Sequence, residues 1–303
     1  MSSSIADAAS PPVDAQFALD RQVFETRALR SELLTVLTWA MAITASIPLF
    51  SVLYMLIVRG GSRLSVEALT SLPPAGFEMG GGFGNAIVGT VAMVGMAAAI
   101  SVPVGILCAI FLAELGPESK LASAVRFSAK TLTGFPSILA GVFAYAMVVL
   151  LTGGYSAPAG ALALAVLMVP TVILTAEESM KTVPKIMKDA AYGMGCTRTQ
   201  VITKIVVPTA IPGVLTGVML AVARAAGETA PLLFTALFSS YWLYHEGELA
   251  VMQPTASLAV LIYNFSGMPF DNQIELAWAA SLVLVLIVLA VNLTSRLIAY
   301  RKV

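Results

Sequence analysis

Charged residues are scarce in this sequence. Only 11% of its 303 residues are Asp, Glu, Lys or Arg, and 58% are of apolar type. Soluble globular domains carry roughly 25% charged residues, so this composition excludes an ordinary water-soluble protein. Lys and Arg together number 17, as do Asp and Glu, which leaves no basic excess of the kind that binds nucleic acid.

Residue types that hold metals or catalyse reactions are scarce as well. Two cysteines, Cys108 and Cys196, and one histidine, His245, are too few for a disulfide framework, a thiolate metal site or a histidine-based zinc site. No Gly-x-x-x-x-Gly-Lys-Ser/Thr phosphate loop occurs, and the glycine-rich run at 80–84 lacks its lysine. We therefore expect a protein that is not an enzyme and binds no cofactor. If ATP is used, another chain hydrolyses it.

Long apolar runs are abundant by contrast. The first, Leu33 to Val58, contains no charged residue and is long enough to cross a hydrocarbon layer of ~30 Å as a helix. The sequence predicts an all-α membrane protein with six transmembrane helices: a tail at 1–32 followed by a six-span domain at 33–303. The later spans are expected at about 85–112, 131–152, 156–175, 211–240 and 276–298.

The distribution of basic residues predicts the orientation. Of the 17 Lys and Arg residues, fourteen lie on the side of the termini, and the opposite loops hold only Arg59 and Arg63. Because Lys and Arg accumulate in cytoplasmic loops, we expect a multi-pass protein of the cytoplasmic membrane with both termini in the cytoplasm. The tail has no apolar or basic region of a cleavable signal, and we expect it to be a disordered cytoplasmic segment.

The cytoplasmic loop at about 176–210 is charged and predicts two short helices. Gly195 is expected to end the first helix, and the capping-box pattern Thr197-Arg198-Thr199-Gln200 to begin the second. Pro208 and Pro212 are expected to stop that second helix before the fifth span. Small or soft side chains recur at helical spacing in the first helix: Met187, Ala190, Ala191 and Met194.

This loop resembles the EAA loop of ABC importer permeases, whose pattern is Glu-Ala-Ala, three residues, Gly, nine residues and Ile-x-Leu-Pro. The spacing from Asp189 through Ile205 to Pro208 matches, with Asp189 in place of Glu and Val207 in place of Leu. The resemblance implies a coupling helix that sits in a groove of an ATP-binding subunit. The alternative is a basic interfacial hairpin that only helps to fix topology. The residues assigned to coupling are Asp189, Ala190, Ala191 and Gly195.

Two opposite charges lie inside the predicted fifth span. An ion at the centre of a membrane helix costs about 2.5 to 3.5 kcal/mol on insertion scales, so Arg224 and Glu228 need a polar surrounding. Arginine suits an oxyanion because its planar guanidinium forms two parallel hydrogen bonds. Glu228 then either holds Arg224 and moderates its affinity, or accepts a hydrogen bond from a protonated phosphate oxygen. The alternative is a structural ion pair between the fifth span and a neighbour.

Three strings extend the resemblance: Arg224–Phe234, Phe77–Thr90 and Phe135–Gly141. In combination they are similar to the phosphate-specific importer permeases of the PstA type, over nearly the whole chain after residue 30. The resemblance implies a type I ABC importer permease fold and an inorganic phosphate substrate. We assign the substrate pathway to Arg224, Glu228 and Thr229.

The resemblance also implies partners. These are a second permease of the PstC type, two ATP-binding subunits of the PstB type that bind ATP and Mg, and an extracytoplasmic phosphate-binding protein of the PstS type. Charge and spacing alone reach only an oxyanion, so sulfate or molybdate stays open as the substrate of an ABC permease. An ion-coupled secondary transporter that uses the two charges as a relay is a further alternative.

Two more segments carry predictions. Gly213 and Gly217 form a Gly-x-x-x-Gly pattern that favours close helix packing. The outward loop at 241–275 includes an apolar stretch at 257–263 that is too short to cross the membrane. It is consistent with an external helix that docks the binding protein or with an extra helix that covers the bundle.

Overall fold

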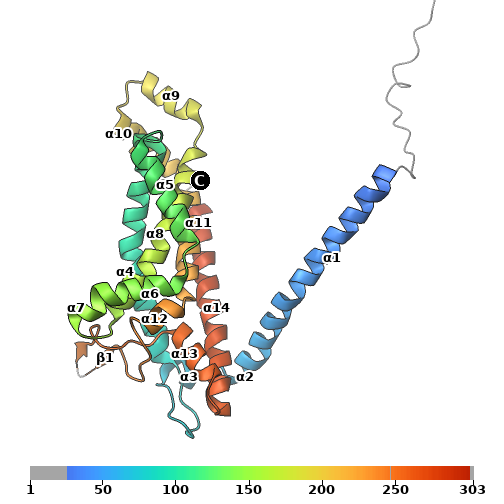
Figure 1. The fold of residues 1–303 in the computed structure, drawn as a ribbon, viewed down its shortest axis with the longest axis vertical. Coiled ribbons are helices and arrows are strands. Elements are labelled where there is room, and N and C mark those ends of the chain that lie inside the picture. Colours follow the sequence, from blue (N-terminus) through green and yellow to red (C-terminus); the bar gives the residue numbers. More distant parts are fainter. Residues whose placement is uncertain (1–25, 246, 301–303) are drawn as a thin grey trace, which may run out of the picture. The chain divides into compact units, whose positions relative to one another are not determined.

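The computed structural model describes residues 26–245 and 247–300, and these are mostly helical (Figure 1). Within the described residues, five helices are long and apolar enough to cross a membrane, and a bent pair of helices makes six if it is counted as one broken span. The five are Leu29–Arg63, Gly84–Leu115, Ala157–Lys181, Arg198–Ala226 and Asp271–Ser295. The fold class is therefore an all-α, multi-pass membrane protein.

The chain forms two compact units that divide after Tyr54. The first unit contains α1 (Thr26–Met55), an apolar helix whose described side chains are nearly all exposed. Of the predicted tail at 1–32, residues 1–25 lie outside the described part of the chain, and 26–32 are the first turns of α1. The large exposed apolar surface of this helix is what a lipid-facing span requires.

The second unit is built around α8 (Ala157–Lys181). This helix packs against α4 (Gly84–Ile110), α11 (Val207–Ala226) and the bent pair, and most of its side chains are buried. Its core is lined by Leu164, Met168 and Val172. The last helix, α14 (Asp271–Tyr300), packs on α11 and completes the bundle.

The predicted start of the span at 131–152 is wrong, because residue 131 lies inside one helix and a bend follows it. Instead, α5 (Lys120–Thr133) ends at Gly134, and α6 (Ser137–Ala144) begins after Pro136 at an angle of 106°. A proline donates no hydrogen bond and disfavours helical backbone in the residue before it, so Phe135 and Pro136 break the helix. The second arm continues through η4 (Tyr145–Val149) and α7 (Leu150–Thr152), and Figure 1 shows α6 and α7 crossing the bundle.

The prediction that Pro208 and Pro212 separate the loop from the fifth span is also wrong. α10 (Arg198–Val201), the π-helical turn η5 (Ile202–Val206) and α11 form one continuous helix. Pro208 lies in the first turn of α11 behind η5, where its missing N–H is tolerated. The preceding helix α8 continues to Lys181, so the predicted loop at 176–210 shortens to residues 182–197, which we name the coupling segment.

The fifth span also ends earlier than predicted. The helix stops at Ala226 rather than near 240, with Gly227 as its C-cap, and a short helix α12 (Ala230–Leu233) follows. Gly227 and Pro231 explain this end, because glycine lowers helix stability and proline cannot continue the helix. The two predicted charges therefore flank a helix terminus and do not lie within one uninterrupted helix.

Gly213 and Gly217 set the distance between α11 and α8. A Cβ atom on Gly217 would lie 2.0 Å from Thr175 Oγ1, and one on Gly213 would lie 2.5 Å from Ser179 Oγ. The predicted close packing is confirmed, and the partner helix belongs to the same chain. The two contacts show that α11 and α8 are antiparallel. Continued along both helices, this pairing places Arg224 level with the middle of α8.

The end of the second unit opposite the coupling segment carries its shorter elements, as Figure 1 shows. α3 (Val66–Thr70) packs against α4, and β1 (Tyr244–His245) pairs antiparallel with β2 (Glu248–Leu249). α13 (Leu258–Ser266) buries Leu258, Leu261 and Phe265 against α4 and α14. Of the two interpretations of the 257–263 stretch, this packing favours a helix that covers the bundle.

Candidate functional site

Arg224 and Glu228 form an ion pair at the end of α11. Arg224 Nε lies 3.4 Å from Glu228 Oε1, and the side chains are 42% and 17% exposed. Arg224 is in the last helical turn, while Glu228 follows Gly227 outside the helix. Among the described residues the pair joins α11 to its own C-terminal extension and not to another span.

Arg224 lies on the open face of α11. Thr216, Leu220 and Arg224 are exposed along one side of the helix, whereas Ala221 and Ala225 face the bundle core. The guanidinium is thus presented to whatever covers this face, at mid-height of the unit. Hydroxyl groups of Thr171, Thr175 and Ser179 continue from this level toward the coupling segment, on a partly exposed side of α8. The hydroxyls of Thr175 and Ser179 donate to the carbonyls of Thr171 and Thr175, within α8 itself.

Thr229 lies between the ion pair and α12. It is half-buried, and its carbonyl accepts hydrogen bonds from Leu232 and Leu233. The short helix that follows is held tightly, because a Cβ atom on Gly141 of α6 would lie 2.6 Å from Pro231 Cα. This contact brings together two of the strings singled out in the sequence, Phe135–Gly141 and Arg224–Phe234.

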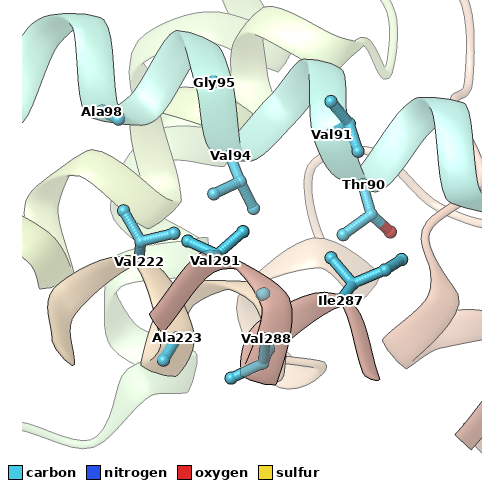
Figure 2. Close-up of a pocket in the computed structure, with 11 residues that line it drawn as sticks. Thr90, Val91, Val94, Gly95, Ala98, Val222, Ala223, Ile287, Val288 and Val291 are labelled. Atoms are coloured by element: carbon cyan, nitrogen blue, oxygen red, sulfur yellow. The ribbon is translucent and has the colours of Figure 1, made fainter. Parts of the chain in front are cut away.

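A cavity of about 210 Å³ lies beside this region, between α4, α11 and α14 (Figure 2). Its walls are apolar, with Val94, Ala223 and Val288 among them. Thr90 supplies its hydroxyl, which already donates to Ala86 O and accepts from Leu258 N. Arg224 is not among the lining residues, so this cavity offers no site for an oxyanion.

The coupling segment has the two predicted helix ends. α9 (Lys185–Gly193) is followed by Gly195 in the left-handed region at φ +84°, and Gly195 N and Cys196 N donate to the carbonyls of Tyr192 and Ala191. Both bonds belong to a Schellman motif, which confirms Gly195 as the residue that ends the helix. The predicted capping box of Thr197 and Gln200 is present as well.

The four residues assigned to coupling divide into two groups. Ala191 is fully buried and packs in the main core cluster of the second unit. Asp189, Ala190 and Gly195 are exposed, and Asp189 has no ion pair in the described part of the chain. Ala191 therefore anchors α9 to the membrane helices, while the other three belong to the free surface.

Sequence reasoning missed Glu114, which ties the coupling segment to α4. Glu114 lies in η3 (Phe111–Leu115), the π-helical end of the α4 span, and pairs with Lys188 of α9. Arg198 of α10 donates to the carbonyls of Glu114 and of Leu115, the latter at 2.9 Å. A lone carboxylate at the end of a long apolar run was the only available clue to this role.

A second missed carboxylate is Glu177, which is buried in α8. Arg126 Nε and Lys181 Nζ lie 2.6 Å and 2.7 Å from Glu177 Oε1. Arg126 also donates to the carbonyls of Pro117 and Leu112, each at 2.8 Å. The sequence had suggested only a topological role for these basic residues, yet Arg126 joins α5, α8 and the end of the α4 span.

Comparisons with known proteins agree with this architecture. Residues 101–302 match the family of binding-protein-dependent transport system inner membrane components. The phosphate transport system permease protein PstA of Yersinia pestis is 37% identical over 276 residues, which cover 91% of this chain and 92% of that protein. PstA of Haemophilus influenzae is 38% identical over 279 residues, covering 92% and 97% of the two chains.

Solved structures share the fold at low sequence identity. A chain of a bacterial alginate ABC transporter, in complex with an alginate-bound periplasmic protein, superposes with a TM-score of 0.62 at 14% identity and covers 90% of this chain and 95% of its own. A chain of the MetNI methionine ABC transporter gives 0.57 at 17% identity, with coverage of 72% and 93%. The fold is that of type I ABC importer permeases, and the chain is a non-catalytic membrane component. By sequence and by fold, this chain belongs to the binding-protein-dependent transport system inner membrane component family and, within it, to the PstA permeases.

Proposed function

We propose that this chain is the permease subunit of an ATP-driven importer that moves inorganic phosphate across the cytoplasmic membrane. The relatives named phosphate transport permeases support the substrate, at 37% and 38% identity over most of the chain. The observation that carries the proposal is Arg224, a cation on an open helix face at mid-height of the bundle. A charge at that depth is costly, and the pairing with Glu228 leaves the Arg224 side chain 42% exposed, so a passing oxyanion can bind the guanidinium as well.

The three pathway residues have complementary chemistry. The Arg224 guanidinium forms two parallel hydrogen bonds to phosphate oxygens. Glu228, at 3.4 Å from Arg224, holds the guanidinium and limits its net attraction, so the ion also leaves. It further accepts a hydrogen bond from a protonated phosphate, a bond that fully ionised sulfate does not offer. The Thr229 hydroxyl is close in sequence and adds a neutral donor.

The coupling segment is proposed to receive motion from ATP-binding subunits of the PstB type, which bind ATP and Mg. Asp189 and Ala190 present an exposed surface for that contact, and Ala191, Glu114 and Arg198 pass the displacement to the membrane helices. A second permease of the PstC type would cover the open face of α11. A phosphate-binding protein of the PstS type would deliver the ion from the opposite end.

The orientation is part of the proposal. One end of the second unit carries Lys120 at the start of α5, Lys185 and Lys188 in the coupling segment, and Arg198 at the start of α10, whereas the opposite end has Arg59 and Arg63. An excess of basic residues marks the cytoplasmic side of a membrane protein. We therefore assign the coupling segment and both termini to the cytoplasm.

Transport by the reconstituted complex tests the function. Proteoliposomes are prepared with this chain, the companion permease, the ATPase and the binding protein. They should take up radiolabelled phosphate only when ATP is present on the side of the membrane where the ATPase lies. Unlabelled phosphate should compete, whereas sulfate and molybdate at equal concentration should not. Competition by sulfate or molybdate instead of phosphate would assign another oxyanion, and uptake without the ATPase would indicate a secondary transporter.

A further inference from the structure

A cavity with one charged side chain in a largely apolar wall lies at the end of the second unit opposite the coupling segment. Its volume is about 410 Å³, and it is separate from the cavity of Figure 2. It opens between the π-helical turn η2 (Leu56–Gly60), α13 and α14. Its walls consist of one cation, two hydroxyls and four apolar or aromatic side chains: Arg59, Ser266, Ser281, Ile262, Ile274, Ala277 and Trp278.

Arg59 is held at the mouth of this cavity. The next residue, Gly60, is pressed against α14, since a Cβ atom there would lie 2.6 Å from the Trp278 carbonyl oxygen. The Arg59 guanidinium carbon lies 5.6 Å from the centre of the Trp278 ring, within the range of a cation–π contact. A tight backbone contact and an aromatic face therefore keep the guanidinium in place.

Arg59 has no carboxylate partner among the described residues. The neighbouring Arg63, one turn further along, is different: its Nε lies 3.8 Å from Glu275 Oε2 and its Nη2 donates to Asn272 Oδ1 at 2.9 Å. Two arginines on the same helix end thus have different environments. The charge of Arg63 is balanced within the chain, while that of Arg59 is available to an anion.

The position of Arg59 matches a membrane interface. It lies near the end of the apolar span Leu29–Arg63, and Trp278 lies in the second turn of α14. Tryptophan and arginine at the ends of spans are typical of the headgroup region of the bilayer. Ile262 and Ala277 add an apolar wall, which the upper part of an acyl chain contacts and which a free inorganic ion does not need.

We propose that this cavity binds the headgroup of an anionic phospholipid in the leaflet opposite the coupling segment. The phosphodiester pairs with Arg59, and the glycerol of a phosphatidylglycerol headgroup donates to the hydroxyl oxygens of Ser266 and Ser281. Those hydroxyls donate their own protons to Tyr263 O and Ala277 O, so their oxygens are left to accept. The proposal concerns the membrane face of the chain and does not depend on the transported ion.

Native mass spectrometry of the assembled complex with phosphatidylglycerol tests the site. Arg59→Gln should weaken lipid binding by at least about fivefold, the factor that corresponds to about 1 kcal/mol for one basic residue at an anionic surface. Arg63→Gln is the matched control and should bind as the wild type does. Equal binding by Arg59→Gln and wild type would overturn the proposal, as would displacement of the lipid by inorganic phosphate.

A second measurement keeps the test independent of how Arg59→Gln folds. In the full-length chain with Trp39→Phe and Trp242→Phe, Trp278 is the remaining tryptophan. Brominated phosphatidylglycerol in nanodiscs should quench its fluorescence more than brominated phosphatidylcholine at the same mole fraction. Equal quenching by the two lipids would show that the cavity has no preference for an anionic headgroup and would overturn the proposal.

Discussion

The Glu177 carboxylate is 4% exposed and lies 2.6 Å from Arg126 Nε, so the end of the bundle next to the coupling segment contains a nearly buried ion pair. Lys181 adds a second cation at 2.7 Å. Removing one partner of such a pair leaves the other charge uncompensated, which costs more than the pair itself contributes. This relationship makes Glu177 a stability determinant that the sequence alone did not reveal.

Glu177→Gln should therefore destabilise the chain. We expect a loss of about 3 kcal/mol in the free energy of unfolding, because Arg126 and Lys181 lose their shared anion. Denaturant titration of the purified chain in detergent measures it. Glu178→Gln changes the adjacent, exposed carboxylate and should stay within about 0.5 kcal/mol of wild type. Equal stability of the two variants would contradict the role of Glu177.

Glu114→Gln should loosen α9 specifically. The variant loses the ion pair with Lys188, a charge-assisted contact of about 1.5 kcal/mol or more, so amide hydrogen exchange in Lys185–Gly193 should become about tenfold faster or more. Exchange in α10 should change less, because Arg198 still reaches the backbone carbonyls. Glu118→Gln, at an exposed position in the loop that follows η3, is the control. Unchanged exchange in α9 would exclude Glu114 as its anchor.

Asp189→Lys separates coupling from folding. Asp189 is exposed and has no ion pair among the described residues, so the variant should keep its stability within about 0.5 kcal/mol. Copurification of the ATP-binding subunits should fall sharply, because the substitution reverses the charge at the proposed contact. Asp189→Glu should retain them. Full retention of the ATPase by the lysine variant would argue against α9 as the docking surface.

Gly217→Ala should destabilise the contact between α11 and α8. The added methyl group would meet Thr175 Oγ1 at 2.0 Å, and such overpacking costs about 1 to 3 kcal/mol. Gly95→Ala in α4 is the matched control: its Cβ atom would have no neighbour within 4 Å, and alanine favours the helix by up to about 1 kcal/mol. Thermal unfolding of both variants in detergent distinguishes them. Gly217→Ala should lower the unfolding temperature, and Gly95→Ala should raise it.

Features that depend on nearby residues could be predicted from the sequence. Apolar runs located the spans, and Gly195 and the Thr197 capping box located helix ends, because each of these depends on a few adjacent residues. No single local rule predicts both the bend of the chain at Pro136 and the continuous helix through Pro208. The same local rule disfavours helix at both prolines, yet the chain bends at the first and continues as a helix through the second.

The candidate site was predictable to the same degree. The pairing of Arg224 with Glu228 followed from their spacing, but the helix end at Ala226 between them did not. The pairs Arg126–Glu177 and Lys188–Glu114 join residues that are 51 and 74 positions apart. Such pairs depend on how the spans pack, and no local pattern reports that packing.

Arg224→Lys tests whether phosphate is recognised through two parallel hydrogen bonds from a planar guanidinium or through the positive charge alone. Lysine keeps the charge but presents it as a point, so phosphate uptake should fall by about tenfold while its dependence on ATP persists. The Michaelis constant and the maximal rate of uptake should be measured separately in proteoliposomes. A lysine variant with wild-type rates would show that the guanidinium geometry is unimportant.

The most direct test of the account is ATP-dependent phosphate uptake by the complete complex that carries Arg224→Ala, with subunit copurification measured on the same sample. All subunits should still assemble, because Arg224 bonds only to Glu228 among the described residues, and uptake should fall to the level seen without ATP. An assembled complex with wild-type uptake would contradict the assignment of Arg224 to the substrate pathway.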